Sequence, residues 1–392
     1  MFPELIFEDA CIAFKNKMYE KAEKGFRIVL SQEPSHAPSL YFMGQIALER
    51  GATEAAVGLF YEAYTADSKN QEYIYALAVS LQETGRLDEA LSYYKRIADL
   101  PEVQNAMGVI YQQQGHTVKA KHAFQKAVQK DPHNANAWTN LGAMCLAASQ
   151  VQEAQKYLKK AIACDAAQGN AHMLLSQLLL EKGQVAAAKK CCLQGLGVLP
   201  SYAPLWQMLG RIYQQMRQWA QALEAVQKAI GLDLYNETLL YDKGLVLEHL
   251  KRTDEAEQAY RGSLRLNPSF APAVNKLAIL LHKKGVSVEA LELYRQLIRE
   301  NPNDGEALLN MAIIVSDVGD YETAAGLFVL LLSKHIYEDQ AHQALAKLLP
   351  VWAKQDKKQA QQYALGWWKN FPDNALARKT YTKLFDKTDV IV

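Results

Sequence analysis

Long hydrophobic runs are missing from this 392-residue chain, and so is an excess of charge of either sign. No stretch approaches the roughly 18–20 apolar residues of a membrane-spanning helix, so we expect no membrane insertion. The 43 Lys and Arg residues nearly cancel the 42 Asp and Glu residues, which gives no general attraction to nucleic acid. We therefore expect partners that are neither nucleic acids nor membranes.

Cysteine is scarce, and recognisable catalytic or metal-binding motifs are lacking. The five cysteines (Cys11, Cys145, Cys164, Cys191 and Cys192) form no CxxC pair and no Cys/His set with zinc-ligand spacing. Their odd number is typical of a reducing compartment, and the acidic amino terminus is unlike a signal peptide, so we expect a cytoplasmic protein. GxSxG, Walker A, HExxH and EF-hand patterns are also absent, which predicts no cofactor, no metal and no enzymatic activity.

What the chain does contain is a 34-residue repeat. Repeats begin at residues 3, 37, 71, 101, 135, 169, 203, 237, 271, 305 and 339, and only the step from 71 to 101 is shorter, at 30 residues. Position 8 is small in every repeat: Ala10, Gly44, Ala78, Gly108, Gly142, Ser176, Gly210, Gly244, Ala278, Ala312 and Ala346. Position 20 is alanine in ten successive repeats, from Ala22 to Ala324. Chance does not fill equally spaced positions in this way.

The apolar positions of each repeat predict two helices. Positions 4, 7, 8 and 11 share one helical face, and positions 20, 24 and 27 share a second. Small residues where the two helices meet allow their backbones to approach closely. Glycine recurs at position 15, for example at Gly51 and Gly115, where it predicts the left-handed end of the first helix. Proline at position 32, as in Pro34 and Pro132, predicts the end of the second helix.

In this pattern the chain resembles the tetratricopeptide repeat family, a helix-turn-helix of 34 residues with characteristic Trp, Leu-Gly, Tyr, Ala, Phe and Pro positions. The resemblance covers about residues 3–373 and is clear in Trp138, Leu141, Gly142 and Ala154. It implies an all-α, right-handed solenoid of about eleven repeats with an inner groove lined by the first helices. It also implies a protein or peptide partner in that groove.

Two irregular repeats define the expected domain organisation. The short repeat lacks four residues near Ala98–Pro101, which predicts either a bend between residues 1–100 and 101–373 or a trimmed loop without global effect. In the last repeat, two extra residues restore the apolar pattern, and Trp367-Trp368 is expected to pack in the core or to anchor a partner. Residues 374–392 are expected to form a capping helix and a tail, in which Asp389–Val392 is either frayed or able to add as a strand to a peptide-binding domain.

The candidate binding residues lie at the first-helix positions expected to face the groove. Many are glutamines and asparagines, whose amides can pair with the backbone of an extended peptide regardless of its sequence, or can simply be solvated. Position 6 does not form an asparagine ladder of the kind found in sugar-transferase repeat domains, and the carboxylate clamp of chaperone-binding members is absent. The predicted site comprises Tyr41, Gln45, Tyr75, Gln82, Asn105, Gln112, Gln113, Thr139, Asn140, Gln177, Gln207, Arg211, Gln214, Tyr241, His249 and Asn275.

These observations favour a scaffold or adaptor that assembles partners through the groove. An alternative is a non-catalytic substrate-targeting or regulatory subunit for a separate enzyme, such as a glycosyltransferase. Residues 1–100 carry 10 basic and 15 acidic side chains, and residues 101–200 carry 10 and 5. This charge asymmetry is explained either by two solvated faces of different sign or by different partner segments for the two stretches. A further hypothesis is self-association, in which the acidic stretch of one chain meets the basic stretch of another.

Overall fold

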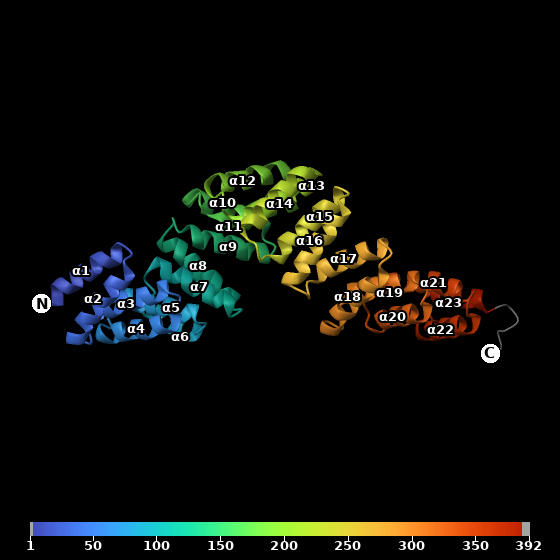
Figure 1. Cartoon of the computed structure of the whole chain (residues 1–392), viewed down its shortest axis with the longest axis horizontal. Coiled ribbons are helices and arrows are strands. Elements are labelled where there is room, and N and C mark those ends of the chain that lie inside the picture. The colour runs from blue at the N-terminus through green and yellow to red at the C-terminus, as the bar shows by residue number, and fades with distance from the viewer. Residues whose placement is uncertain (1–2, 386–392) are drawn as a thin grey trace. The chain divides into compact units, whose positions relative to one another are not determined.

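The structure, a computed structural model, describes residues 3–385 and is built there from helices without any strand (Figure 1). Twenty-three α-helices and one short 3₁₀ helix follow one another in this range. The first twenty-two form eleven successive pairs, one for each predicted repeat, and α23 stands alone at the end. The predicted all-α helical-repeat solenoid is therefore confirmed.

The helices fall into two compact units, Met1–Pro200 and Ser201–Val392. Odd-numbered helices up to α21 are the first helices of the repeats and even-numbered helices up to α22 are the second helices. Unit 1 contains α1 (Pro3–Lys15), α2 (Tyr19–Gln32), α3 (Ala37–Glu49), α4 (Thr53–Ala66), α5 (Gln71–Glu83), α6 (Leu87–Tyr94), η1 (Lys95–Ile97), α7 (Pro101–Gln113), α8 (Thr117–Lys130), α9 (Ala135–Ala147), α10 (Val151–Cys164), α11 (Gly169–Glu181) and α12 (Val185–Val198).

Unit 2 continues the same alternation and ends with the unpaired helix. It contains α13 (Ala203–Gln215), α14 (Trp219–Leu232), α15 (Glu237–His249), α16 (Thr253–Leu266), α17 (Ala271–Lys283), α18 (Ser287–Glu300), α19 (Gly305–Asp317), α20 (Tyr321–Ser333), α21 (Glu338–Trp352), α22 (Lys357–Asn370) and α23 (Ala375–Leu384).

In ten of the eleven repeats, the turn between the two helices contains one left-handed residue. Position 15 has a positive φ in the first ten repeats, as in Gly51 (φ 73°) and Gly115 (φ 74°). Four of these residues are not glycine, namely Lys17, Ser149, Arg217 and Lys251. The backbone of the turn thus requires the left-handed conformation even where the side chain disfavours it.

The two helices of a repeat meet at the small position 8, as predicted. A Cβ atom on Gly44 would lie 2.6 Å from the ring of Phe60, and one on Gly244 would lie 2.4 Å from the ring of Tyr260. Phe60 and Tyr260 occupy position 24 of their repeats and are fully buried. The alanines at position 20 are also fully buried, from Ala22 to Ala324. The core is therefore a row of large side chains packed against nearly bare backbone.

The short repeat loses the end of its second helix. Helix α6 has 8 residues, whereas α4 and α8 have 14, and η1 replaces its final turn before α7 begins at Pro101. The missing four residues are thus removed from the helix itself. The compact units divide after Pro200, and the bend and the boundary expected at residue 100 stay predictions.

The carboxyl-terminal repeat is closed by aromatic packing. The indole of Trp367 is buried and donates a hydrogen bond to Nδ1 of His342 at 2.9 Å. Trp368 stacks on Tyr381 of α23 with ring centroids 4.7 Å apart. Trp367 therefore packs in the core and Trp368 packs against the capping helix. Of the two expectations, core packing or an exposed anchor for a partner, the structure agrees with core packing. Helix α23 has Asn374 as its N-cap, and the tail Asp389–Val392 lies outside the described residues.

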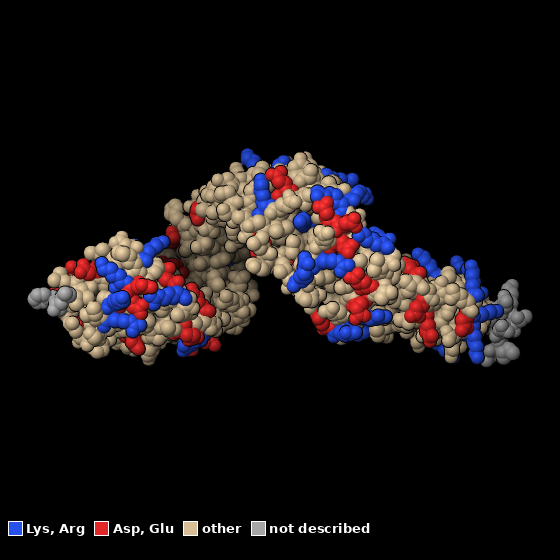
Figure 2. All heavy atoms as spheres, in the orientation of Figure 1, with Lys and Arg blue, Asp and Glu red and all other residues tan. Residues whose placement is uncertain are grey.

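Charged side chains of both signs lie on the described surface. Over α1–α6, the face of unit 1 visible in Figure 2 has Lys and Arg side chains intermixed with Asp and Glu. Within residues 3–385, every helix is too short or too polar to span a bilayer.

Candidate binding surface

All sixteen predicted binding residues lie on first helices. In unit 1 they belong to α3, α5, α7, α9 and α11, and in unit 2 to α13, α15 and α17. The period of the repeat produces this distribution, because equal positions recur on equivalent helices. Their side chains nevertheless differ in exposure and in hydrogen-bonding partners.

Polar side chains link consecutive first helices in both units. Asn140 Nδ2 donates to Asn105 Oδ1 at 3.0 Å in unit 1. In unit 2, Asn310 Nδ2 donates to Asn275 Oδ1 at 3.3 Å. Each pair joins position 5 of one repeat to position 6 of the next, 35 residues later. A search for asparagine at position 6 alone therefore does not reveal these links.

A third link of the same spacing contains a buried carboxylate. Gln207 Nε2 donates to Asp242 Oδ2 at 2.8 Å, and the guanidinium of Arg211 lies 3.7 Å from the same oxygen. Burial raises the pKa of Asp242 above its usual value, although the hydrogen bond from Gln207 and the charge of Arg211 oppose that shift. Asp242 is absent from the predicted set. The signal that would have found it is the position 5 to position 6 spacing.

The tyrosines predicted in unit 1 are half-buried and hydrogen-bonded or packed against other rings. Gln45 Nε2 donates to the hydroxyl of Tyr41 at 2.7 Å. Tyr94 donates its hydroxyl to Gln82 Oε1 at 3.2 Å, and its ring lies 6.0 Å from that of Tyr75. Burial raises the pKa of the Tyr41 and Tyr75 phenols, so both remain neutral at physiological pH.

Other predicted residues divide into buried and exposed side chains. Thr139 is buried and donates its hydroxyl to the backbone oxygen of Ala135 at 2.8 Å, so this hydroxyl is used within its own helix. Gln112 and Gln113 at the end of α7 are exposed. Gln177 is also exposed, and its amide donates to Glu181 at 2.9 Å. The exposed glutamines are the amides most accessible to a ligand.

In unit 2, aromatic rings accompany the predicted polar residues. Tyr241 meets Phe270 edge to face with ring centroids 5.6 Å apart, and burial raises the pKa of its phenol. His249 lies flat on Trp219, with ring centroids 3.9 Å apart and an interplanar angle of 7°. A cavity of about 600 Å³ beside this stack is lined by Gln214, Gln215, Arg217, Trp219 and His249.

A second cavity of unit 2 lies beyond the last predicted residue. It has a volume of about 590 Å³ and is lined by residues of α19, α20 and α21. Ile313 and Val351 contribute exposed apolar surface to it, and Lys347 contributes a charge. Sequence reasoning missed this cavity because the irregular last repeat obscures which positions of α21 correspond to those of earlier first helices.

The part of the chain that the structure describes contains no cluster suited to a metal ion, and its adjacent cysteines Cys191 and Cys192 are buried. No three His, Cys, Asp or Glu side chains of residues 3–385 converge in a way that would hold a metal ion. Cys191 and Cys192 are buried, and burial raises the pKa of both thiols, that of Cys192 to about 12. Both thiols are therefore protonated and unreactive at neutral pH.

Profiles of the tetratricopeptide repeat match residues 8–71, 71–104, 111–178 and 208–269, which together make up more than half of the chain. The chain belongs to the tetratricopeptide repeat family. Tetratricopeptide repeat proteins are in general protein-interaction scaffolds and are generally non-catalytic. Curated protein sequences give no significant match to this chain.

Solved structures resemble this chain at low sequence identity, and that of human IFIT1 shares its fold. Human IFIT1, solved as a dimer with m7Gppp-AAAA, is 16% identical with a TM-score of 0.56, covering 89% of this chain and 89% of IFIT1. Pseudomonas aeruginosa PilF is 22% identical with a TM-score of 0.47, covering 53% of this chain and 94% of PilF. YrrB, described as a tetratricopeptide repeat protein with an unusual peptide-binding site, is 22% identical with a TM-score of 0.38, covering 48% of this chain and 97% of YrrB.

Proposed function

We propose that this tetratricopeptide repeat protein is a non-catalytic cytoplasmic scaffold that binds an extended polypeptide along its first helices. The observation that carries the proposal is a set of three polar links between consecutive first helices, one in unit 1 and two in unit 2, each with a side-chain amide as the donor. An asparagine side chain carries both donors and an acceptor, and each asparagine pair uses one donor of one residue and the acceptor of the other. Asn275 is buried, whereas Asn105, Asn140 and Asn310 are partly exposed. A peptide backbone needs this combination of donors and acceptors.

The exposed first-helix amides extend this polar surface. Gln112, Gln113 and Gln177 present flexible amides, and Tyr41 and Tyr75 add half-buried rings with little conformational freedom to lose on binding. Such a mixture suits recognition of backbone and shape more than recognition of one charge pattern. We therefore expect a partner with an extended segment and few strictly required side chains.

Site-directed photo-crosslinking in the producing cell tests which helices contact the partner. A photoreactive phenylalanine derivative replaces Gln112 or Gln177 on first helices, and matched variants carry it at Lys126 or Lys156, which are exposed on second helices. We expect the same protein to be crosslinked from both first-helix positions and from neither second-helix position. Equal crosslinking from all four positions would contradict the proposal.

The same experiment separates a protein partner from an RNA partner. IFIT1, which has the same fold, was solved with the capped RNA m7Gppp-AAAA. Crosslinked complexes are treated with nuclease or with protease before electrophoresis, and we expect the shifted band to resist nuclease. If the complexes crosslinked at Gln112 and Gln177 are sensitive to nuclease, the ligand is RNA and not a polypeptide.

A further inference from the structure

The cavity beside the Trp219–His249 stack is formed by a single repeat and the first helix of the next. Gln214 and Gln215 end α13, Arg217 is the left-handed residue of the following turn, Trp219 begins α14, and His249 ends α15. The cavity therefore lies at the turn end of the first helices. Its volume of about 600 Å³ leaves ample space for a single amino-acid side chain.

One buried hydrogen-bond donor of a residue that lines this cavity is unused. Gln214 Nε2 is buried and has no hydrogen-bond partner. An unpaired buried donor is unfavourable, and a ligand oxygen would satisfy it. The guanidinium of Arg217 has no acidic partner among residues 3–385, in contrast to Arg252 and Arg261, which pair with neighbouring glutamates. A cation and a buried amide donor thus line one cavity without an anion.

Nearby acidic side chains are held by other groups. Glu248, which precedes His249, accepts a hydrogen bond from Tyr260 at 2.8 Å through Oε2. Asp242 is bonded to Gln207 and lies near Arg211. None of the five residues that line the cavity is acidic. The cavity therefore has donors that the surrounding protein does not neutralise.

We propose that this cavity binds the carboxylate side chain of a glutamate or aspartate in a protein partner, an inference that rests on the scaffold function proposed above. Arg217 supplies the charged donor and Gln214 supplies the buried neutral donor. The flat Trp219–His249 stack forms an apolar wall for the methylene groups of the ligand. One fixed positive charge matches a carboxylate better than a doubly charged phosphate. The carboxylate clamp described for chaperone-binding relatives is a set of residues at other repeat positions. This chain lacks that set of residues.

The test measures binding of two fluorescein-labelled peptides, octaglutamate and octaglutamine, to the full-length chain by fluorescence anisotropy. Low ionic strength, about 50 mM, keeps screening weak. We expect octaglutamate to bind at least about tenfold more tightly than octaglutamine, because a charged hydrogen bond is stronger than a neutral one. Equal affinities would overturn the proposal.

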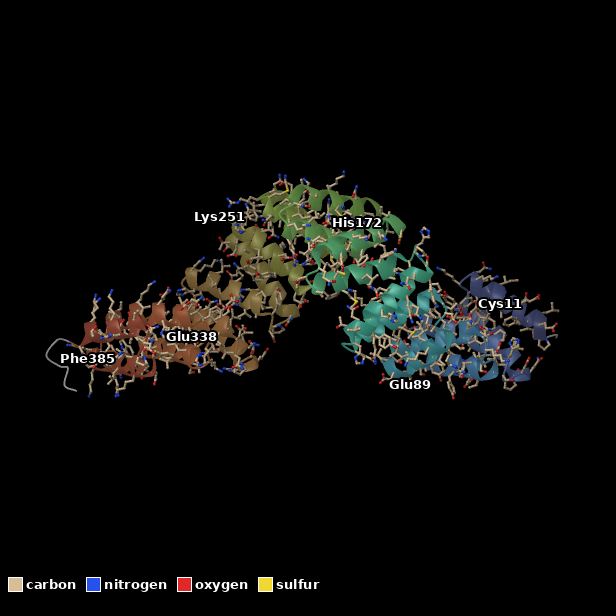
Figure 3. All side chains as sticks on the ribbon, turned by 180° about the vertical axis from the view of Figure 1, so that it is seen from behind. Cys11, Glu89, His172, Lys251, Glu338 and Phe385 are labelled. Atoms are coloured by element: carbon tan, nitrogen blue, oxygen red, sulfur yellow. The ribbon has the colours of Figure 1, made fainter. Side chains whose placement is uncertain are left out.

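Variants locate the binding site. Arg217→Gln removes the charge, and Gln214→Leu removes the unpaired donor, so each should weaken octaglutamate binding about tenfold. Lys251→Gln is the matched control. Lys251, which is labelled in Figure 3, occupies the same left-handed turn position one repeat later and carries the same charge. It is not among the residues that line the cavity. We expect it to change affinity less than about twofold. The same loss with Lys251→Gln, or no loss with Gln214→Leu, would refute the site.

Two further readouts complete the design. The thermal unfolding midpoint of Gln214→Leu should stay unchanged or rise, since the variant removes an unsatisfied buried group, and a fall together with lost binding would assign Gln214 a structural role instead. If a phosphoserine peptide binds more tightly than octaglutamate, the ligand of this cavity is a phosphate and not a carboxylate. Octaglutamate that fails to bind while first-helix crosslinking succeeds would reject this cavity and leave the scaffold function standing.

Discussion

At the scale of single residues, the turn inside each of the first ten repeats depends on one backbone conformation. Glycine adopts the left-handed region without strain, whereas Lys17, Ser149, Arg217 and Lys251 adopt it at a cost. No neighbouring heavy atom lies within 4 Å of the position that a Cβ on Gly115 would take. Glycine is therefore favoured here by the backbone conformation and not by a lack of space. A substitution at Gly115 therefore measures backbone strain without adding a side-chain contact.

We predict opposite effects for two substitutions at this position. Ser149→Gly should stabilise the protein by about 1 kcal/mol, and Gly115→Ala should destabilise it by about 1 kcal/mol, because the left-handed region disfavours an L residue by roughly that amount. Urea unfolding followed by circular dichroism measures both. Identical midpoints for Gly115→Ala and the wild type would show that the turn relaxes to another conformation.

His342 gives the carboxyl-terminal core a dependence on pH. Its Nδ1 accepts the indole hydrogen of Trp367, and burial lowers its pKa below the usual 6.5, although Glu338 and Asp339 act in the opposite direction. The unfolded chain thus binds a proton more readily than the folded chain. The stabilising contribution is present above pH 6.5 and is lost as the pH falls below that value.

We expect the urea midpoint of the carboxyl-terminal repeats, followed by tryptophan fluorescence, to decrease between about pH 6.5 and pH 5. His342→Asn is the comparison, because an amide oxygen can still accept from Trp367 but does not titrate in this range. Its midpoint should depend less on pH than that of the wild type. Parallel pH profiles for the two proteins would assign the effect to other groups.

At the scale of helices, the two members of a repeat pack at glycine. Adding a methyl group to Gly244 would bring it to 2.4 Å from the buried ring of Tyr260, whose hydroxyl bonds to Glu248. Gly231 on α14 differs, because a methyl group added there would have no neighbouring atom within 4 Å, and the residue is exposed. The same substitution therefore has different physical consequences at the two sites.

Gly244→Ala should destabilise the protein by about 1–3 kcal/mol, since a close-packed interface must move to accept the methyl group. Gly231→Ala should stabilise it by about 0.5–1 kcal/mol, since alanine restricts the unfolded chain and favours the helix. Denaturation midpoints measured under identical conditions test the pair. A stabilising effect of Gly244→Ala would mean that Tyr260 moves aside without cost.

At the scale of the whole molecule, the short third repeat is the feature with the widest consequence. Helix α6 ends after 8 residues, so η1 and α7 follow where other repeats continue a second helix of 13 or 14 residues. Stacking of successive repeats fixes how a solenoid curves. A change in the length of one second helix is therefore expected to alter the rotation between the repeats on either side.

Insertion of four helix-forming residues after Ala98 should restore a full second helix and remove the predicted bend near residue 100. Small-angle X-ray scattering compares the maximum dimension of the wild type and the insertion variant, and circular dichroism confirms that the variant is folded. We expect a measurable difference in the distance distributions. Superimposable distributions would favour the trimmed loop without global effect.

The sequence by itself determined the repeat, the paired helices, the left-handed turns and the capping helix, because each depends on spacing within about 34 residues and on local backbone chemistry. Only the tertiary structure decided which polar side chains meet between repeats, such as Asn105 with Asn140 and Gln207 with Asp242. It also brought Trp219, from the start of a second helix, against His249 beside an unpaired Gln214. Those contacts depend on the rotation from one repeat to the next, which no periodicity in the sequence encodes.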